Sequence, residues 1–113
     1  MGRQRTVMSP VTRDAVTVFG ARVKMARHDH GWTQRDLAER AGVSQRTVAA
    51  VELGSAATSI GNAFNVAVAA GVPLFGTDDP RALEAMGTYE RERAALMPKR
   101  VRYQEMPDVN TDF

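Results

Sequence analysis

Apolar residues recur three and four positions apart along most of this 113-residue chain, which is the spacing of amphipathic helices. The pattern is most regular in residues 33–53, where it describes two short helices joined by one tight turn. Longer amphipathic segments lie before and after this stretch. The sequence therefore predicts an all-α fold, with helices at about residues 12–29, 33–41, 44–53, 59–70 and 78–97.

Capping residues mark both ends of the two short helices. Thr33 can cap the first helix with its hydroxyl, and Asp36, three residues later, completes a capping box. Gly42 follows that helix where a left-handed backbone is needed, and Ser44 is a favourable N-cap for the second helix. Gly54 stops the second helix. Local chemistry therefore predicts the same two helices as the apolar spacing.

The apolar residues of this stretch also have a specific order. A small residue, Ala38, precedes Gly42 by four positions, and Val48 and Val51 follow the glycine by six and nine positions. This order resembles that of the phage-repressor, or Xre-type, helix-turn-helix regulators, and the resemblance extends over about residues 19–74. It implies a five-helix phage-repressor-like helix-turn-helix domain, followed here by a C-terminal helix and a flexible tail.

In such domains the second of the two helices enters the DNA major groove with its first residues against the base edges. Gln45 can pair with the N6 and N7 atoms of adenine, and Arg46 with the O6 and N7 atoms of guanine. Ala50, on the same face, suits a thymine methyl group. The competing interpretation is a solvated helix face. The surrounding pattern favours base contact by Gln45, Arg46, Thr47 and Ala50.

The resemblance also implies contacts to the DNA backbone. In phage repressors the residue matching Gln34 contacts a phosphate and braces the base-reading residue that matches Gln45. Thr33 and Ser44 stand at helix N-termini, whose N–H groups favour anions, so both are expected near phosphates. Relatives often place basic residues directly after the second helix. Residues 55–77 of this chain carry no charged side chain, which puts strong phosphate anchoring at that loop in doubt.

One structural ion pair is also implied by the resemblance. In phage repressors an arginine in the first helix pairs with a glutamate near the end of the base-reading helix. Arg27 and Glu52 occupy the matching positions. If the pair is buried, removal of one partner leaves an uncompensated charge, whereas replacement of both by apolar residues costs much less.

The first residues of the chain are basic and contain no acid. Because the Ser9-Pro10 step disfavours a helix through that point, the first helix is expected to begin at about residue 12 or 14. Arg3 and Arg5 either lie along the DNA backbone or in a minor groove, or belong to a start that has no role in binding. The expected organisation is a flexible basic arm (1–13), the helix-turn-helix domain (14–76), a C-terminal helix (77–97) and a basic-then-acidic tail (98–113).

Net charge is only +2, but the charges are unevenly distributed. Residues 1–54 contain nine basic and five acidic residues, whereas residues 55–113 contain six basic and eight acidic residues. A basic first half fits a partner with phosphates. In the expected helix at 59–70, one side carries Ile60, Ala63, Phe64 and Ala67, and further apolar surface that suits a partner is left by Val66, Val68 and Ala69.

The C-terminal segment supports a second, narrower resemblance. The sequence ALMPKRVR, followed by an acidic tail that ends in Asp112-Phe113, resembles the C-termini of HipB-like antitoxins. These bind an operator as homodimers, hold a HipA-like protein-kinase toxin inactive and repress their own operon. The resemblance implies the same partners here, with Tyr103 and Phe113 as candidate toxin contacts.

Several function classes are disfavoured by the sequence. The chain has no cysteine, no glycine-rich phosphate loop and no cluster of metal ligands or catalytic carboxylates. We therefore expect that the protein is not an enzyme and that it binds no cofactor and no metal. No apolar run is long enough to span a bilayer, which favours a soluble, cytoplasmic protein. The main prediction is a DNA-binding repressor. The alternative is a protein-interaction module on the same scaffold without specific DNA binding.

Overall fold

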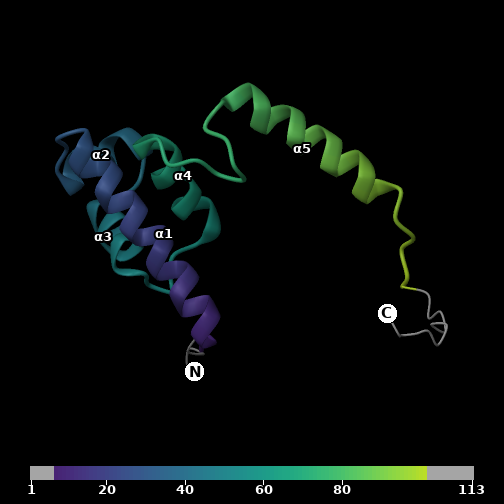
Figure 1. Ribbon diagram of the computed structural model, residues 1–113, viewed down its shortest axis with the longest axis horizontal. Coiled ribbons are helices and arrows are strands. Elements are labelled where there is room, and N and C mark those ends of the chain that lie inside the picture. Colours follow the sequence, from purple (N-terminus) through teal and green to yellow (C-terminus); the bar gives the residue numbers. More distant parts are fainter. Residues whose placement is uncertain (1–6, 102–113) are drawn as a thin grey trace, which may run out of the picture. The chain divides into compact units, whose positions relative to one another are not determined.

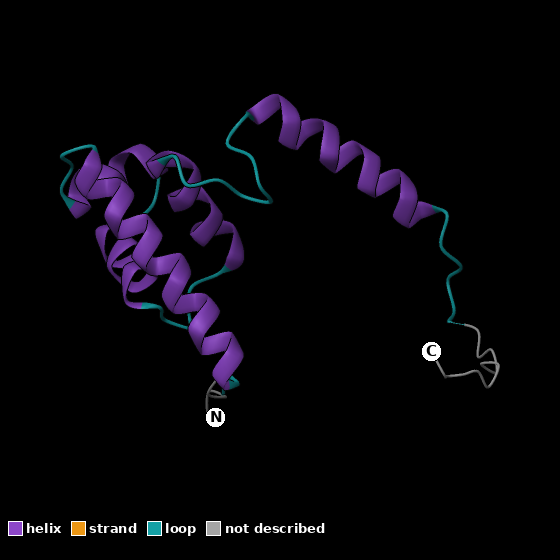
Figure 2. Cartoon of the chain, viewed as in Figure 1, coloured by secondary structure: helices purple, strands orange, loops and turns teal. Residues whose placement is uncertain are grey.

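The computed structural model describes residues 7–101, which contain five α-helices and no strand. Figure 1 shows their order along the chain, and Figure 2 shows the loops that join them. The chain divides into two units, residues 1–80 and 81–113. The all-α fold is confirmed, with four helices in the first unit and the last helix as the fifth, where a five-helix domain followed by a further helix was expected. The helices are α1 (Pro10–Asp29), α2 (Gln34–Ala41), α3 (Gln45–Leu53), α4 (Ile60–Ala70) and α5 (Pro80–Ala95).

Helix α1 begins earlier than the sequence pattern predicts. Ser9 is its N-cap and accepts a hydrogen bond from the backbone N–H of Thr12, and Pro10 is its first residue. The expectation of an arm through residue 13 was therefore wrong at its C-terminal boundary. The physical reason is that proline suits the first helical position, where its missing N–H would have no intrahelical partner. Pro10 starts the helix instead of preventing it.

The predicted caps of α2 and α3 are confirmed. Thr33 and Asp36 form the complete capping box, with the Thr33 hydroxyl accepting from the Asp36 N–H and the Asp36 carboxylate from the Thr33 N–H. Gly42 then adopts the left-handed conformation, with φ of 71°. Ser44 caps α3 by accepting from the Thr47 N–H. These local bonds set where both helices begin and how sharply the chain turns between them.

The core of the first unit lies where α1 and α2 each pack against both α3 and α4. The largest side chains in it are fully buried and come from all four helices. Val66 is one of them, although it was expected to add exposed apolar surface, while Ile60 is 71% exposed. The reason is that α4 turns Val66, Ala67 and Ala70 inward. The four largest fully buried residues are Val23, Leu37, Val48 and Val66.

Gly20 allows α1 to lie unusually close to α3. A Cβ atom at this position would be 2.4 Å from the Val51 carbonyl oxygen and 2.8 Å from that of Glu52. Both neighbours are backbone atoms and cannot swing aside. The distance between α1 and the C-terminal half of α3 therefore depends on a residue without a side chain.

Helix α5 belongs to the second unit, and none of its residues is buried. Arg93 forms an ion pair of 2.9 Å with Glu90, and its guanidinium lies 5.5 Å from the centroid of the Tyr89 ring. Such exposed contacts on one helix each contribute only a few tenths of a kcal/mol, roughly 0.2–0.5. The described helix ends at Ala95, near the predicted end at about residue 97.

Candidate nucleic-acid interface

The first turn of α3 presents two of the predicted base-contacting side chains to solvent. Gln45 and Arg46 are both exposed, and they stand directly after the Ser44 cap. Thr47 is half-buried, and its hydroxyl lies 3.0 Å from the Ser44 hydroxyl. Ala50, one turn later, is also half-buried. This end of α3 therefore has one amide and one guanidinium free to reach base edges, with smaller groups beside them.

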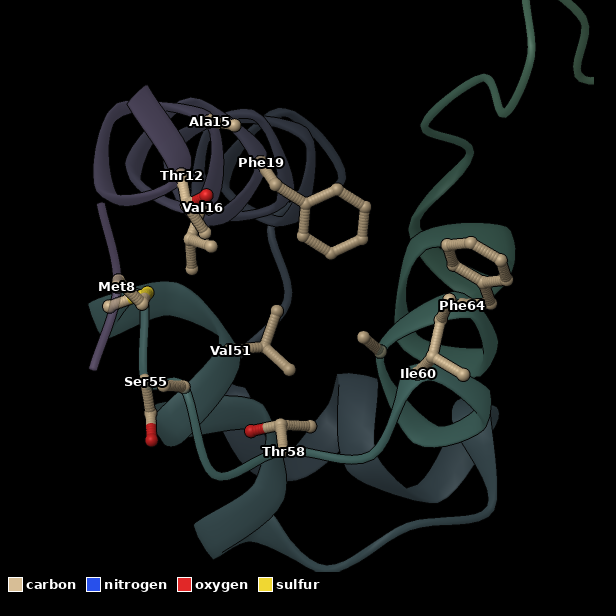
Figure 3. Close-up of a pocket in the computed structure, with 12 residues that line it drawn as sticks. Met8, Thr12, Ala15, Val16, Phe19, Val51, Ser55, Thr58, Ile60 and Phe64 are labelled. Atoms are coloured by element: carbon tan, nitrogen blue, oxygen red, sulfur yellow. The ribbon is translucent and has the colours of Figure 1, made fainter. Parts of the chain in front are cut away.

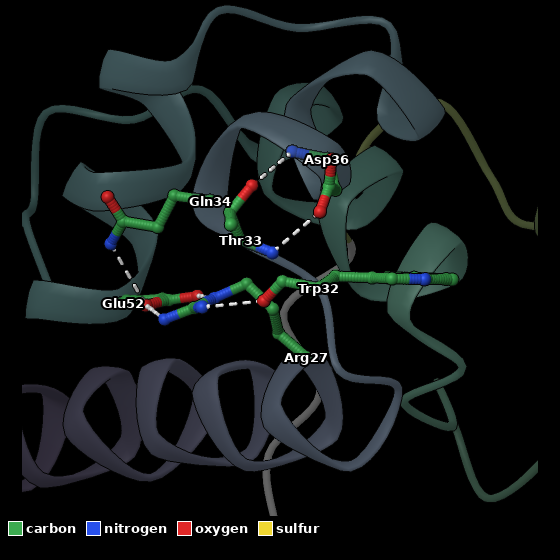
Figure 4. Close-up of polar contacts among 6 residues, drawn as sticks. All are labelled: Arg27, Trp32, Thr33, Gln34, Asp36 and Glu52. Carbon is green, nitrogen blue, oxygen red and sulfur yellow. Dashed lines mark hydrogen bonds and ion pairs between the residues drawn. The ribbon is translucent and has the colours of Figure 1, made fainter.

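A buried ion pair fixes α3 against α1. The Arg27 Nε donates to Glu52 Oε2 at 2.6 Å and Nη2 donates to Oε1 at 2.9 Å, while Nη1 donates to the Trp32 carbonyl oxygen at 2.9 Å (Figure 4). The two side chains are 9% and 4% exposed. The guanidinium thus joins α1, the loop before α2 and the end of α3.

Gln34 completes this cluster through its side-chain amide. Its Nε2 donates to Glu52 Oε1 at 3.1 Å, as Figure 4 shows. The brace expected between Gln34 and Gln45 stays a prediction, and in this structure the Gln34 amide is hydrogen-bonded to Glu52. One of its two N–H groups remains available for another acceptor.

The surroundings of Glu52 keep it ionised. Burial by itself raises the pKa of this carboxyl, but hydrogen bonds from Arg27 and Gln34 and the positive charges of Arg27 and Lys24 together lower the pKa below its ordinary value. The hydrogen bond to Glu52 likewise raises the pKa of Arg27 against the opposing effect of burial. Both groups therefore carry full charge at neutral pH.

The hydroxyls of Thr33 and Ser44, predicted to lie near phosphates, act as helix caps. At the N-terminus of α2 the Asp36 carboxylate also accepts the Thr33 N–H, and this bond lowers the pKa of Asp36. A negative charge therefore already occupies the start of α2. An incoming phosphate there meets repulsion from Asp36, unlike one at the start of α3, whose first turn has no acid.

Trp32, in the loop before α2, contacts His30 at the end of α1 and Arg40 of α2. The His30 ring stacks on it at 4.0 Å between centroids, and the Arg40 guanidinium lies 4.1 Å from the ring centroid. The His30 Nε2 is 3.0 Å from the Ala70 carbonyl oxygen at the end of α4. This stack ties the loop before α2 to α4.

A small notch beside the Arg27–Glu52 pair contains three residues that sequence reasoning did not single out: Lys24, Ala49 and Leu53. It is lined by α1, α2 and α3 and has a volume of about 240 Å³. Lys24 and Leu53 lie at this notch, together with Arg27, Gln34, Ala49 and Glu52. The available signal was the spacing of Gly20, Lys24 and Arg27, which places them on one side of α1.

A larger apolar pocket, of about 390 Å³, lies between α1, the loop after α3, and α4. Figure 3 shows Phe19 on one side, Ile60 and Phe64 on the other, and Val51 and Thr58 between them. None of its lining residues is charged. Three of its lining residues, Thr12, Ser55 and Thr58, carry hydroxyl groups.

Four predicted site residues lie outside the described residues: Arg3, Arg5, Tyr103 and Phe113. Within residues 7–101, no group of three or more His, Cys, Asp or Glu side chains could hold a metal ion. Over the same residues, no helix has both the length and the apolar character needed to cross a membrane.

Comparison with known families places one domain in the chain. Residues 23–76, from the middle of α1 to just before α5, match the family described as Helix-turn-helix. No curated protein and no solved structure matched the chain. The match includes α2, α3 and α4, and therefore the first turn of α3, the buried ion pair and the notch.

Proposed function

We propose that this chain, whose residues 23–76 form an Xre-like helix-turn-helix domain, is a sequence-specific repressor that binds duplex operator DNA. A helix-turn-helix domain is a DNA-binding regulatory module, and α3 is the helix that enters the major groove in this fold. The observation that carries the proposal is the exposed pair Gln45 and Arg46 on a helix held by a buried, bidentate ion pair. Because the buried pair holds α3 in place, the side-chain donors of Gln45 and Arg46 favour contact with base edges over the interpretation of a solvated helix face.

The proposal includes a homodimer on a two-fold operator, with half-sites about 34 Å apart or a multiple of that. Support comes from the uncharged apolar pocket and from apolar residues that α4 and the following turn leave exposed. Ile60, Val68 and Phe75 are all more than half exposed. A second copy is the occupant we assign to this surface, because a two-fold dimer needs a self-complementary patch.

Replacing Gln45 by alanine should weaken binding to operator DNA by about 1–3 kcal/mol and relax the preference at one base pair. The measurement is a titration of purified protein against DNA from upstream of its own gene, repeated with each base substituted in turn. Two chains per operator are expected.

Asn65→Ala provides the matched control, because Asn65 is an exposed amide on α4, outside α3. This variant should bind as the unmodified protein does. If Gln45→Ala leaves both affinity and base preference unchanged, Gln45 is not a base contact.

The alternative function is a protein-interaction module that retains the helices without specific DNA binding. The uncharged stretch at residues 55–77 favours it. A repressor with several phosphate contacts loses orders of magnitude in affinity, about 10³–10⁵-fold for six to ten contacts, between about 50 and 200 mM salt. Weak binding without sequence preference would support the alternative.

The narrower form of the proposal is an antitoxin that also binds a HipA-like protein kinase and represses its own operon. Its support is the basic-then-acidic C-terminal sequence. Deletion of residues 103–113, which include Tyr103 and Phe113, should weaken binding to the kinase at least tenfold and leave operator affinity nearly unchanged, because α2 and α3 are intact. Calorimetry with the kinase encoded beside this gene measures the first effect. Equal loss of both activities would contradict a toxin-specific tail.

A further inference from the structure

The proposed DNA-binding surface must neutralise backbone phosphates, and the segment after α3 supplies no cation for them. Residues 55–77, which follow α3, contain no positive charge, and Asp36 places a negative charge at the start of α2. Affinity for duplex DNA depends on cations that neutralise phosphates. Cations near α3 must therefore come from another part of the first unit.

The notch beside the buried ion pair supplies such a cation. Lys24 comes from α1, Gln34 from the start of α2, and Ala49 and Leu53 from α3. Gly20 lets α1 approach the backbone of α3, and Lys24, one turn later on α1, consequently stands at the edge of α3. The notch is thus lined by residues from each of the first three helices.

Within the described residues, no carboxylate forms an ion pair with Lys24. The notch also contains Arg27 and Glu52, but these two neutralise each other through their bidentate contact. Lys24 is exposed and forms no ion pair with any residue from 7 to 101, although it is near enough to Glu52 to help lower that pKa. One uncompensated positive charge therefore remains at the rim, beside the second N–H of the Gln34 amide.

The notch also lies on the same line of α3 as Gln45. Gln45, Ala49 and Leu53 recur four residues apart, and Leu53 is 84% exposed. Eight residues of helix rise about 12 Å. The major groove is also about 12 Å wide, so a helix that enters with Gln45 against a base edge brings its Leu53 end near a phosphate backbone at the groove margin.

Beyond the Gln34 phosphate contact that the family resemblance already implies, we infer that Lys24 of α1, which lines the same notch, is a further contact to a DNA backbone phosphate. The inference rests on the proposed DNA binding and adds a residue of α1 to that surface. The contact is independent of base sequence, because every nucleotide presents the same phosphate. It takes the place of the basic residues that are missing after α3.

The test is Lys24→Gln, measured by titration against a random-sequence duplex and against upstream DNA over about 50–200 mM salt. Because each chain of the proposed dimer contributes one Lys24, the slope of log affinity against log salt should become shallower by about 0.9 per chain, or about 1.8 per dimer. Affinity near 0.1 M salt should fall roughly five- to tenfold for each contact removed, on both duplexes. Lys24→Arg should retain the slope, since it keeps the charge.

Arg22→Gln is the matched control, because it also removes one positive charge from an exposed position on α1. Two residues of helix rotate by about 200°, so Arg22 lies on the other side of α1. Its slope should stay close to that of the unmodified protein, and both variants should melt at similar temperatures. Equal slopes for the two variants would overturn the phosphate site while leaving DNA binding intact. Absence of salt-sensitive binding by the unmodified protein would overturn the proposed function and this site with it.

Discussion

Replacing Arg27 by methionine is expected to lower the free energy of unfolding by about 3–5 kcal/mol, because it leaves the Glu52 carboxylate buried without its partner. Glu52 is 4% exposed, and the same substitution removes the donor to the Trp32 carbonyl. Denaturant unfolding followed by circular dichroism measures the loss. The double variant Arg27→Met/Glu52→Leu should be clearly more stable than Arg27→Met, because no unpaired charge remains.

The exposed pair Arg35–Glu39 provides the control for this prediction. Its atoms are 3.6 Å apart and its side chains are 78% and 70% exposed, so Arg35→Met should change stability by no more than about 1 kcal/mol. If Arg27→Met is no more harmful than Arg35→Met, the Arg27–Glu52 pair is not buried in solution.

The same pair predicts a dependence of stability on pH. The folded-state pKa of Glu52 is lowered, so its contribution is fully present above the pKa of the unfolded chain, about 4.3, and is lost as pH falls through the folded-state value. Stability of the unmodified protein should therefore fall in acid. The Arg27→Met/Glu52→Leu variant should lose less stability over the same pH range.

Gly20→Ala should destabilise the protein by about 1–3 kcal/mol, because the added Cβ would overlap the carbonyl oxygens of Val51 and Glu52. Relief of this overlap requires α1 and α3 to separate. Because α3 is the proposed base-reading helix, operator affinity should fall together with stability. Denaturant unfolding and operator titration on the same preparation measure both effects.

Gly61→Ala is the matched control in α4. A Cβ atom there meets no atom within 4 Å, and removal of a helical glycine is expected to be neutral or to stabilise by up to about 1 kcal/mol. If Gly20→Ala lowers the free energy of unfolding and Gly61→Ala raises it, the loss in Gly20→Ala is due to the close packing of α1 on α3. Equal stabilities would show that the two helices separate without cost.

The position and caps of α3 could be predicted from the sequence because their determinants are local. Each cap is a hydrogen bond between residues three positions apart, such as Ser44 to Thr47 and Thr33 to Asp36. Such bonds need only the correct residue types in the correct order. The start of α1 was misplaced because Pro10 was taken as a barrier to a helix when it is the first helical residue.

The inner face of α4 and the contacts of Gln34 could not be predicted in the same way. Val66 and Ile60 are both apolar, and helical spacing alone allows either to face the core. The structure buries Val66 because of how α4 rotates against α2 and α3, and this rotation depends on side-chain packing across elements. Gln34 likewise reaches Glu52 only because α2 and α3 cross at that point.

The sequence by itself determined the helices of this protein, the caps of α2 and α3, and the polar residues at the start of α3, since these depend on neighbours within one helical turn. Only the tertiary structure decided that Gly20 brings α1 against α3 and that Lys24 therefore meets Gln34 and Leu53. The physical reason is the distance along the sequence between the residues that interact. A cap is satisfied within four residues, whereas the phosphate notch needs three helices to be packed at fixed distances and rotations.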